Sequence, residues 1–118
     1  MTMFNDTCIV INHYIDNNDA DQYQETTLTG IYWERSRGIQ TEPGGYSNDS
    51  SILVVIPYSI SVSSQYVQPN EFEALPDKSG YWTLQEGDKI ICNGKEMTIT
   101  SISDYPHGSM AHWEVGGV

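Results

Sequence analysis

The stretch from Leu75 to Ile91 reads LPDKSGYWTLQEGDKII and carries the strongest indication of the fold. It begins with turn-forming residues, continues with two adjacent aromatic residues, and turns again at Glu86–Asp88. Turn formers that alternate with β-branched and aromatic residues are typical of short strands joined by tight turns. We therefore predict one strand at Tyr81–Gln85 and another at Lys89–Cys92.

Similar patterns elsewhere in the chain predict further strands. The run Ser51–Tyr58 is apolar on both faces, so we expect it in the middle of a sheet. Asn93–Gly94 is typical of a two-residue hairpin turn and leads into an expected strand at Lys95–Ser103. The remaining strands are expected at Thr7–Ile15, Thr26–Glu34 and Met110–Val115, with a weaker extended piece at Ile60–Val67 and a flexible end at Gly116–Val118.

Two local features modify this pattern. Gly30 lies inside an expected strand and indicates a bulge or a close backbone approach. Pro69–Leu75 predicts one or two helical turns, because proline and glutamate both favour the first turn of a helix. The 118 residues therefore predict one all-β domain, a small barrel or sandwich of about seven short strands with one helical turn and a long loop.

The charge excludes several classes of partner. Sixteen acidic residues face five basic ones, which gives a net charge of -11 and a pI near 4.3. Binding to phosphate backbones or anionic lipids needs a basic patch, so we expect neither sequence-specific nucleic-acid binding nor membrane binding. The acidic surface serves either solubility or the passage of DNA without sticking. The N-terminus lacks a basic region followed by an apolar core, so we expect a cytosolic protein.

Residues that could carry catalysis are few. The sequence has no G-x-S-x-G motif, and Cys8 and Cys92 lie in expected strands without a C-x-x-C spacing. We expect both cysteines to be reduced, buried and inert, because burial raises a thiol pKa. These observations predict a non-enzymatic protein without a cofactor.

Two acidic or histidine-rich segments invite a metal-site hypothesis. The run Asp16–Asp21 lacks the glycine and the distal glutamate of a calcium loop, so we interpret it as a solvated turn. A looser cluster near the C-terminus could serve a small metal-dependent enzyme only if three or four ligands converged. We favour a loop histidine and a strand histidine there, and no metal; the cluster consists of Asp104, His107, His112 and Glu114.

The three tryptophans leave an alternative open. Trp33, Trp82 and Trp113, with several tyrosines, could form an exposed platform for a carbohydrate or a peptide. They could equally form the core of a small β-domain, which we favour for Trp33 and Trp82. A carbohydrate- or peptide-binding module is therefore the alternative function.

One long segment is expected to contact other proteins. Arg35–Asp49 has no periodicity and contains Pro43-Gly44-Gly45, and a loop of this length in a small domain is often functional. We predict that this loop orders against a neighbouring subunit, and that Gln68–Lys78 forms a second contact. The residues predicted to make oligomer contacts are Arg35, Arg37, Ile39, Glu42, Tyr46 and Phe72.

Four segments together resemble a family of small structural proteins from the morphogenesis clusters of tailed phages and prophages of Gram-positive bacteria. The segments are GIYW ending at Trp33, ILVVIPYS from Ile52, the Leu75–Ile91 stretch, and HWEVGG from His112. The resemblance spans most of the chain, from about Phe4 to Gly117.

This resemblance implies a virion structural protein of the head-tail joining, head-closure or tail-completion type. It also implies a small β-barrel or sandwich that assembles into a homo-oligomeric ring with other neck or tail proteins. Such a protein would occupy the host cytoplasm during assembly and the virion afterwards. The resemblance implies no active-site residue.

Overall fold

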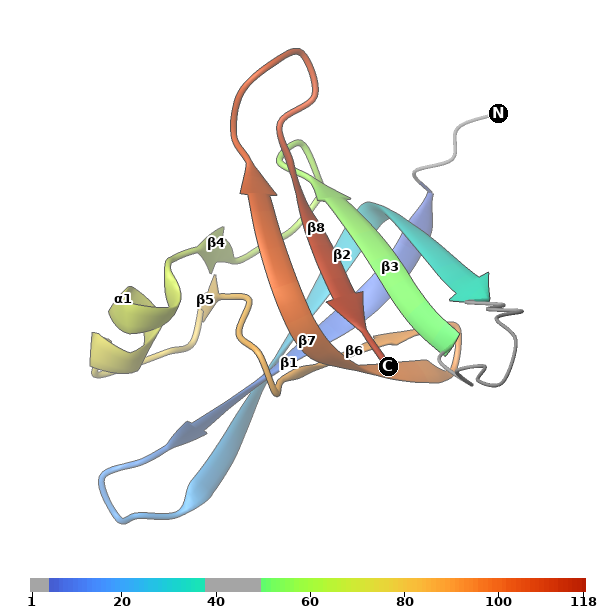
Figure 1. Ribbon diagram of the computed structural model, residues 1–118. Coiled ribbons are helices and arrows are strands. Elements are labelled where there is room, and N and C mark those ends of the chain that lie inside the picture. The colour runs from blue at the N-terminus through green and yellow to red at the C-terminus, as the bar shows by residue number, and fades with distance from the viewer. Residues whose placement is uncertain (1–4, 38–49) are drawn as a thin grey trace.

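The computed structural model describes residues 5–37 and 50–118, in which six antiparallel strands close into a barrel (Figure 1). The strand order around the barrel is β1-β2-β3-β8-β7-β6, and β6 returns to β1. Closure gives every barrel strand two neighbours over part of its length. The strands are β1 (Asp6–Ile15), β2 (Asp21–Arg37), β3 (Ser50–Pro57), β6 (Lys89–Cys92), β7 (Lys95–Tyr105) and β8 (His112–Gly117).

The core fills the inside of this barrel. Residues along β1 alternate between buried and partly exposed positions, as a strand with one face inside requires. β3 lies between β2 and β8, which confirms its predicted central position. The all-β prediction is confirmed. The residues that form the core are Cys8, Val10, Leu28, Ile31, Ile52, Val54, Ile56, Trp82, Leu84, Ile90, Cys92, Met97, Ile99, Trp113 and Val115.

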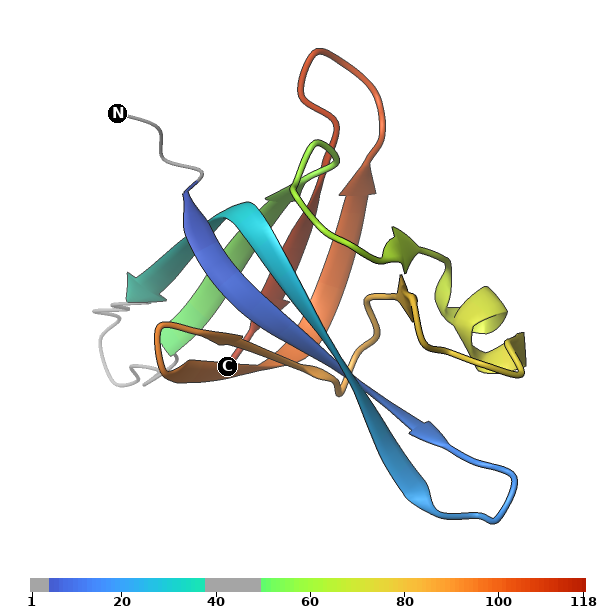
Figure 2. The ribbon, with the colours of Figure 1, turned by 180° about the vertical axis from the view of Figure 1, so that it is seen from behind.

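The chain segment that connects β3 to β6 forms a small appendage, which lies beside the barrel (Figure 2). It consists of β4 (Gln65–Tyr66), the helix α1 (Pro69–Ala74) and β5 (Tyr81–Trp82), with β4 and β5 paired in parallel. The predicted helix is confirmed. The predicted strand at 81–85 is shorter than expected, because the Thr83 N–H bonds to the side chain of Asn12, at 3.1 Å, and not to a strand.

β2 is longer than the predicted strand at both ends. Gly30 has a φ of 101° and lies between the residue pairs of Asp6 with Ile31 and Thr7 with Thr29, so the predicted bulge is confirmed. The bulge lies near the point where β2 changes its pairing from β1 to β3, which begins at Tyr32. One long strand therefore serves two parts of the sheet.

The hairpin at Asn93–Gly94 has positive φ angles of 52° and 78°, as the prediction of a two-residue turn requires. The expectation of a flexible glycine end was wrong. Gly116 and Gly117 belong to β8, and the backbones of Thr98 and Val118 bond to each other in both directions, at 3.0 and 3.1 Å. The last residues of the chain are therefore part of the barrel wall.

The two cysteines are free, and both are buried, as predicted. Cys8 and Cys92 lie opposite each other on β1 and β6. Burial raises the pKa of both thiols above the usual value, and most strongly that of Cys8. Because the thiolate is the reactive form, burial and the raised pKa disfavour reaction of either side chain.

Candidate functional site

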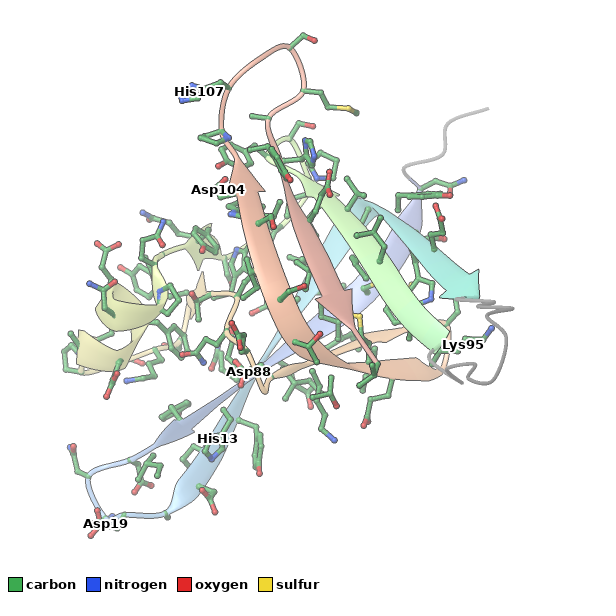
Figure 3. All side chains as sticks on the ribbon, viewed as in Figure 1. His13, Asp19, Asp88, Lys95, Asp104 and His107 are labelled. Atoms are coloured by element: carbon green, nitrogen blue, oxygen red, sulfur yellow. The ribbon has the colours of Figure 1, made fainter. Side chains whose placement is uncertain are left out.

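The β1–β2 hairpin continues beyond the barrel as a projecting arm, which we define as residues 12–24 (Figures 1 and 2). The last pair between β1 and β6 is Ile11 with Lys89, whereas β1 and β2 stay paired as far as Ile15 and Asp21. Figure 3 places His13 and Asp19 on this arm and Asp88 where it leaves the barrel. The arm is therefore a two-stranded ribbon with solvent on much of its surface.

The tip of the arm is organised by the side chain of Asp16. Its Oδ1 accepts hydrogen bonds from the backbone N–H groups of Asn18 and Ala20, at 2.8 and 3.0 Å. Its Oδ2 accepts a bond from Gln22 Nε2 at 2.9 Å. These bonds, that to Ala20 above all, lower the pKa of the Asp16 carboxyl, so it stays ionised at neutral pH. The predicted solvated turn is thus an ordered one.

Apolar side chains are exposed on the arm. Tyr23 is 64 % exposed and Ile15 is 59 % exposed. The Tyr23 ring lies 5.2 Å from the His13 ring, and His13 Nε2 lies 2.8 Å from Asp21 Oδ1. These contacts hold Tyr23 and His13 in place on one face, so the arm presents a defined apolar and acidic surface.

A buried polar network fixes the arm where it leaves the barrel. Asp88 Oδ2 accepts bonds from Asn12 Nδ2 at 3.0 Å and Gln85 Nε2 at 2.7 Å, and its Oδ1 accepts one from the His13 N–H at 3.2 Å. Asn12 Nδ2 also donates to the Thr83 carbonyl oxygen at 2.8 Å. Asn12 and Asp88 are both buried. Because buried polar groups are costly unless bonded, this network specifies one orientation of the arm.

The helix α1 packs against one side of the arm. The Tyr14 and Phe72 rings meet edge to face with centroids 6.1 Å apart. Lys78 Nζ lies 4.9 Å from the Tyr14 ring centroid and donates to the Leu75 carbonyl oxygen at 2.8 Å. A shallow groove between arm and helix is lined by residues of both, including Ile15 and Glu73. The helix therefore supports the base of the arm.

An aromatic cluster joins the appendage to the barrel wall at β8. Trp113 lies 4.3 Å from Tyr58, 4.5 Å from Tyr66 and 5.7 Å from Trp82, measured between ring centroids. Trp82 and Trp113 are buried and Trp33 packs against the core. The core interpretation of Trp82 is confirmed, Trp113 also belongs to the core, and Trp33 is partly buried against it.

The loose C-terminal cluster is not brought together. His112 Nε2 lies 3.0 Å from Glu114 Oε2, Asp104 accepts a bond from the Tyr58 hydroxyl, and His107 lies in the β7–β8 loop (Figure 3). Within the ranges 5–37 and 50–118, no three His, Cys, Asp or Glu side chains are placed to hold a metal ion. The same ranges contain no helix that is long and apolar enough to cross a membrane.

The residues predicted to make oligomer contacts lie in different parts of the structure. Arg35 and Arg37 lie in β2, so the part of the expected loop up to Arg37 is strand. Ile39, Glu42 and Tyr46 lie outside the described residues. Phe72 is only 1 % exposed and faces Tyr14, so its prediction as a surface contact needs correction: it anchors α1 within its own chain.

Sequence reasoning missed the arm as the candidate contact. The signal was present, because Ile15 and Tyr23 flank the Asp16–Asp21 turn at positions where a strand continues. The turn was predicted, but the strand after it was expected to begin only at Thr26. Asp21 and Glu25 have low strand propensity, which concealed the start of β2.

Comparison with protein-family models matches residues 2–118 to a family of unknown function, DUF6751. The match covers nearly the whole chain, so the protein belongs to this family. No curated protein matches the sequence.

Proposed function

We propose that this member of the family is a non-enzymatic structural protein of a tailed phage or prophage particle that acts at the head-tail junction. The role is of the head-tail joining, head-closure or tail-completion type. One observation carries the proposal: a closed barrel projects an arm that is fixed at its base and has Ile15 and Tyr23 exposed upon it.

The construction of the arm supports a contact role. An isolated two-stranded hairpin has little stability of its own in water. Here the Asp88 network and the ring of Phe72 hold its base, although its outer part buries almost nothing. Buried contacts that fix an exposed apolar hairpin are expected if a neighbouring protein covers the arm after assembly.

The charge supports the same role. A net charge of -11 disfavours adhesion to phosphate, which suits a subunit of a ring through which a genome passes. The partners would be further copies of the chain and other neck or tail proteins. Assembly would take place in the host cytoplasm and the protein would remain in the virion. The segments 35–49 and 68–78 stay proposed contacts.

Deletion of the gene from an inducible prophage tests the proposal. We expect induced cells to release separate heads and tails, visible by negative-stain electron microscopy, and infectivity to be lost. Mass spectrometry of purified complete particles from the parent prophage should detect the chain.

Complementation provides the control. The unaltered gene should restore joined particles, whereas a variant with residues 15–21 replaced by a short turn should not, provided that its barrel still unfolds cooperatively. Normal yields of infectious particles from the deletion strain would refute the proposal.

A further inference from the structure

The β2 strand has an open backbone edge along the arm. β1 occupies one side of β2 from Asp21 onward, whereas pairing with β3 on the other side begins only at Tyr32. Thr29 is bridged to Ser61 on that side by bonds of 3.1 and 2.9 Å. Within the described ranges, no residue pairs with that side of β2 between Asp21 and Leu28.

Strand geometry identifies the groups on this edge. The N–H and C=O of Thr29 point away from β1, and backbone direction alternates along a strand. The same groups of Asp21, Tyr23, Glu25 and Thr27 therefore point outward. They form a row about 20 Å long, from a rise of roughly 3.3 Å per residue. Such a row is a template for one more strand.

The chemistry of the edge selects the partner. Asp21 and Glu25 lie on the edge and Asp16 and Asp19 at the adjacent tip, while residues 12–27 contain no lysine or arginine. A second copy would add its own carboxylates to this edge and no lysine or arginine, so it would raise the local negative charge without neutralising it. A strand with lysine or arginine at alternate positions would place opposite charges beside them.

Exposed side chains at the same place would add to the affinity. Asp21, Tyr23, Glu25 and Thr27 are all exposed and lie on the face of the ribbon that also carries His13. A partner strand would therefore meet one aromatic ring between two carboxylates. That pattern fits an extended segment in which basic residues alternate with small or apolar ones.

We infer that the Asp21–Thr27 edge of β2 binds an extended, lysine- or arginine-bearing segment of a different protein by strand addition. The inference deepens the joining role and rests on the proposed function, because it names the partner chemistry and the mode of contact of the same arm. Main-chain bonds would supply affinity, and the carboxylates would choose the basic partner and its register.

A synthetic peptide tests this on the purified full chain. The probe is a peptide of alternating threonine and lysine, about eight residues long, with two versions N-methylated on alternate residues. One version blocks the amides of one edge of the peptide, and the other blocks the opposite edge. Both keep the same charge. Amide NMR spectra of the protein report which residues respond.

Strand addition predicts unequal binding. One methylated version should bind like the parent peptide and the other at least about tenfold more weakly, since several main-chain bonds to the β2 edge are lost. The shifted amides should include Tyr23, Glu25 and Thr27. The variant Thr27→Pro, which blocks an outward N–H without changing charge, should also weaken binding; thermal unfolding checks its fold.

Other results overturn the inference. Equal binding of both methylated peptides, with shifts spread over all acidic patches, would mean simple charge attraction. Equal affinity for a peptide with glutamate in place of lysine would refute the preference for a basic partner. Failure of every peptide to bind at low salt would refute the binding site on the β2 edge. Dimerisation of the free chain through the edge would show that the occupant is a second copy.

The two proposals fail separately. The deletion strain could release infectious particles while the purified chain still binds the peptide. That result would refute the head-tail role and support the edge site. Loss of joining in the deletion strain, with no peptide binding by the purified chain, would support the head-tail role and refute the edge site.

Discussion

The barrel and the arm share the β1–β2 hairpin but differ in the number of strand partners and in the burial of their side chains. In the barrel, β1 has a neighbour on each side and its inward residues Cys8 and Val10 are completely buried. In the arm, β1 and β2 have only each other as strand partners, and Ile15 and Tyr23 are mostly exposed. The same two strands thus change from core scaffold to exposed ribbon at the Asn12–Asp88 contact.

This difference separates stability from contact. Apolar burial, the main favourable term in folding, is concentrated in the barrel. The arm contributes little burial, so its residues are free to serve recognition without weakening the scaffold. Substitutions in the two regions should therefore have separable effects on unfolding and on joining.

The largest expected effect is at the seam of the barrel, with Gly117→Ala. An added Cβ would lie 2.3 Å from the Thr98 carbonyl oxygen and 2.5 Å from Met97 Cγ, so backbone or core must move. We expect a loss of about 2 kcal/mol or more in the free energy of unfolding, measured by urea denaturation. Gly116→Ala is the matched control and should cost less, because its Cβ meets the rotatable Ser101 hydroxyl at 2.6 Å. Equal losses would contradict this account of β8.

The junction should show the next largest effect. Asp88→Ala removes the acceptor of three hydrogen bonds, whose donors are the buried Asn12 side chain, the partly buried Gln85 side chain and the His13 backbone N–H. We expect a loss of about 2–3 kcal/mol in unfolding free energy, and of less for Asp88→Asn, which keeps one oxygen. Hydrogen exchange should also become faster in the arm. Unchanged exchange there would show that the network does not hold the arm.

Substitutions on the arm surface should leave the unfolding free energy almost unchanged and should impair joining. The double variant Ile15→Ser, Tyr23→Ser should change the unfolding free energy by no more than about 0.5 kcal/mol. In the prophage complementation assay it should nevertheless lower the yield of joined particles. Tyr105→Ser with Met110→Ser is the control, because these side chains are 47 % and 49 % exposed at the opposite end. An equal loss of joining in both variants would break the distinction between the ends.

The smallest expected effect concerns His112. Its Nδ1–H donates to the Met110 carbonyl oxygen at 2.8 Å and its Nε2 faces Glu114 at 3.0 Å, so both bonds require the protonated ring. These bonds raise the pKa of His112 above its usual 6.5. Relative to His112→Gln, stability should be fully present below about pH 6.5 and be lost as the pH rises through the folded pKa.

For such a partly exposed pair the difference should stay under about 1 kcal/mol. Urea denaturation of both proteins at several pH values between about 5 and 9 would measure it. An advantage of the parent chain that grows with pH would contradict the assignment.

Local patterns were sufficient for most of the strands. Asn93–Gly94 predicted its hairpin because these two residues tolerate positive φ, and Pro69 with Glu71 predicted the start of α1. Gly30 predicted the bulge for a similar reason. In each case a few neighbouring residues determine the backbone conformation, so sequence alone carried the information.

The arm and the seam depend on distant partners. The Asn12–Asp88 bond joins residues 76 positions apart, and nothing near Asn12 indicates it. Gly116 and Gly117 suggest flexibility in isolation, and only the close approach of β7 explains why β8 lacks side chains there.

By itself, the sequence determined an all-β chain with a strong negative charge, several turns at the right places, and two buried free cysteines. These properties depend on composition and on neighbours within a few residues. Only the tertiary structure decided that the sheet closes, where the hairpin leaves it, and which side of β2 remains open. Those features depend on the register between strands that lie far apart in the chain, and local propensity does not encode that register.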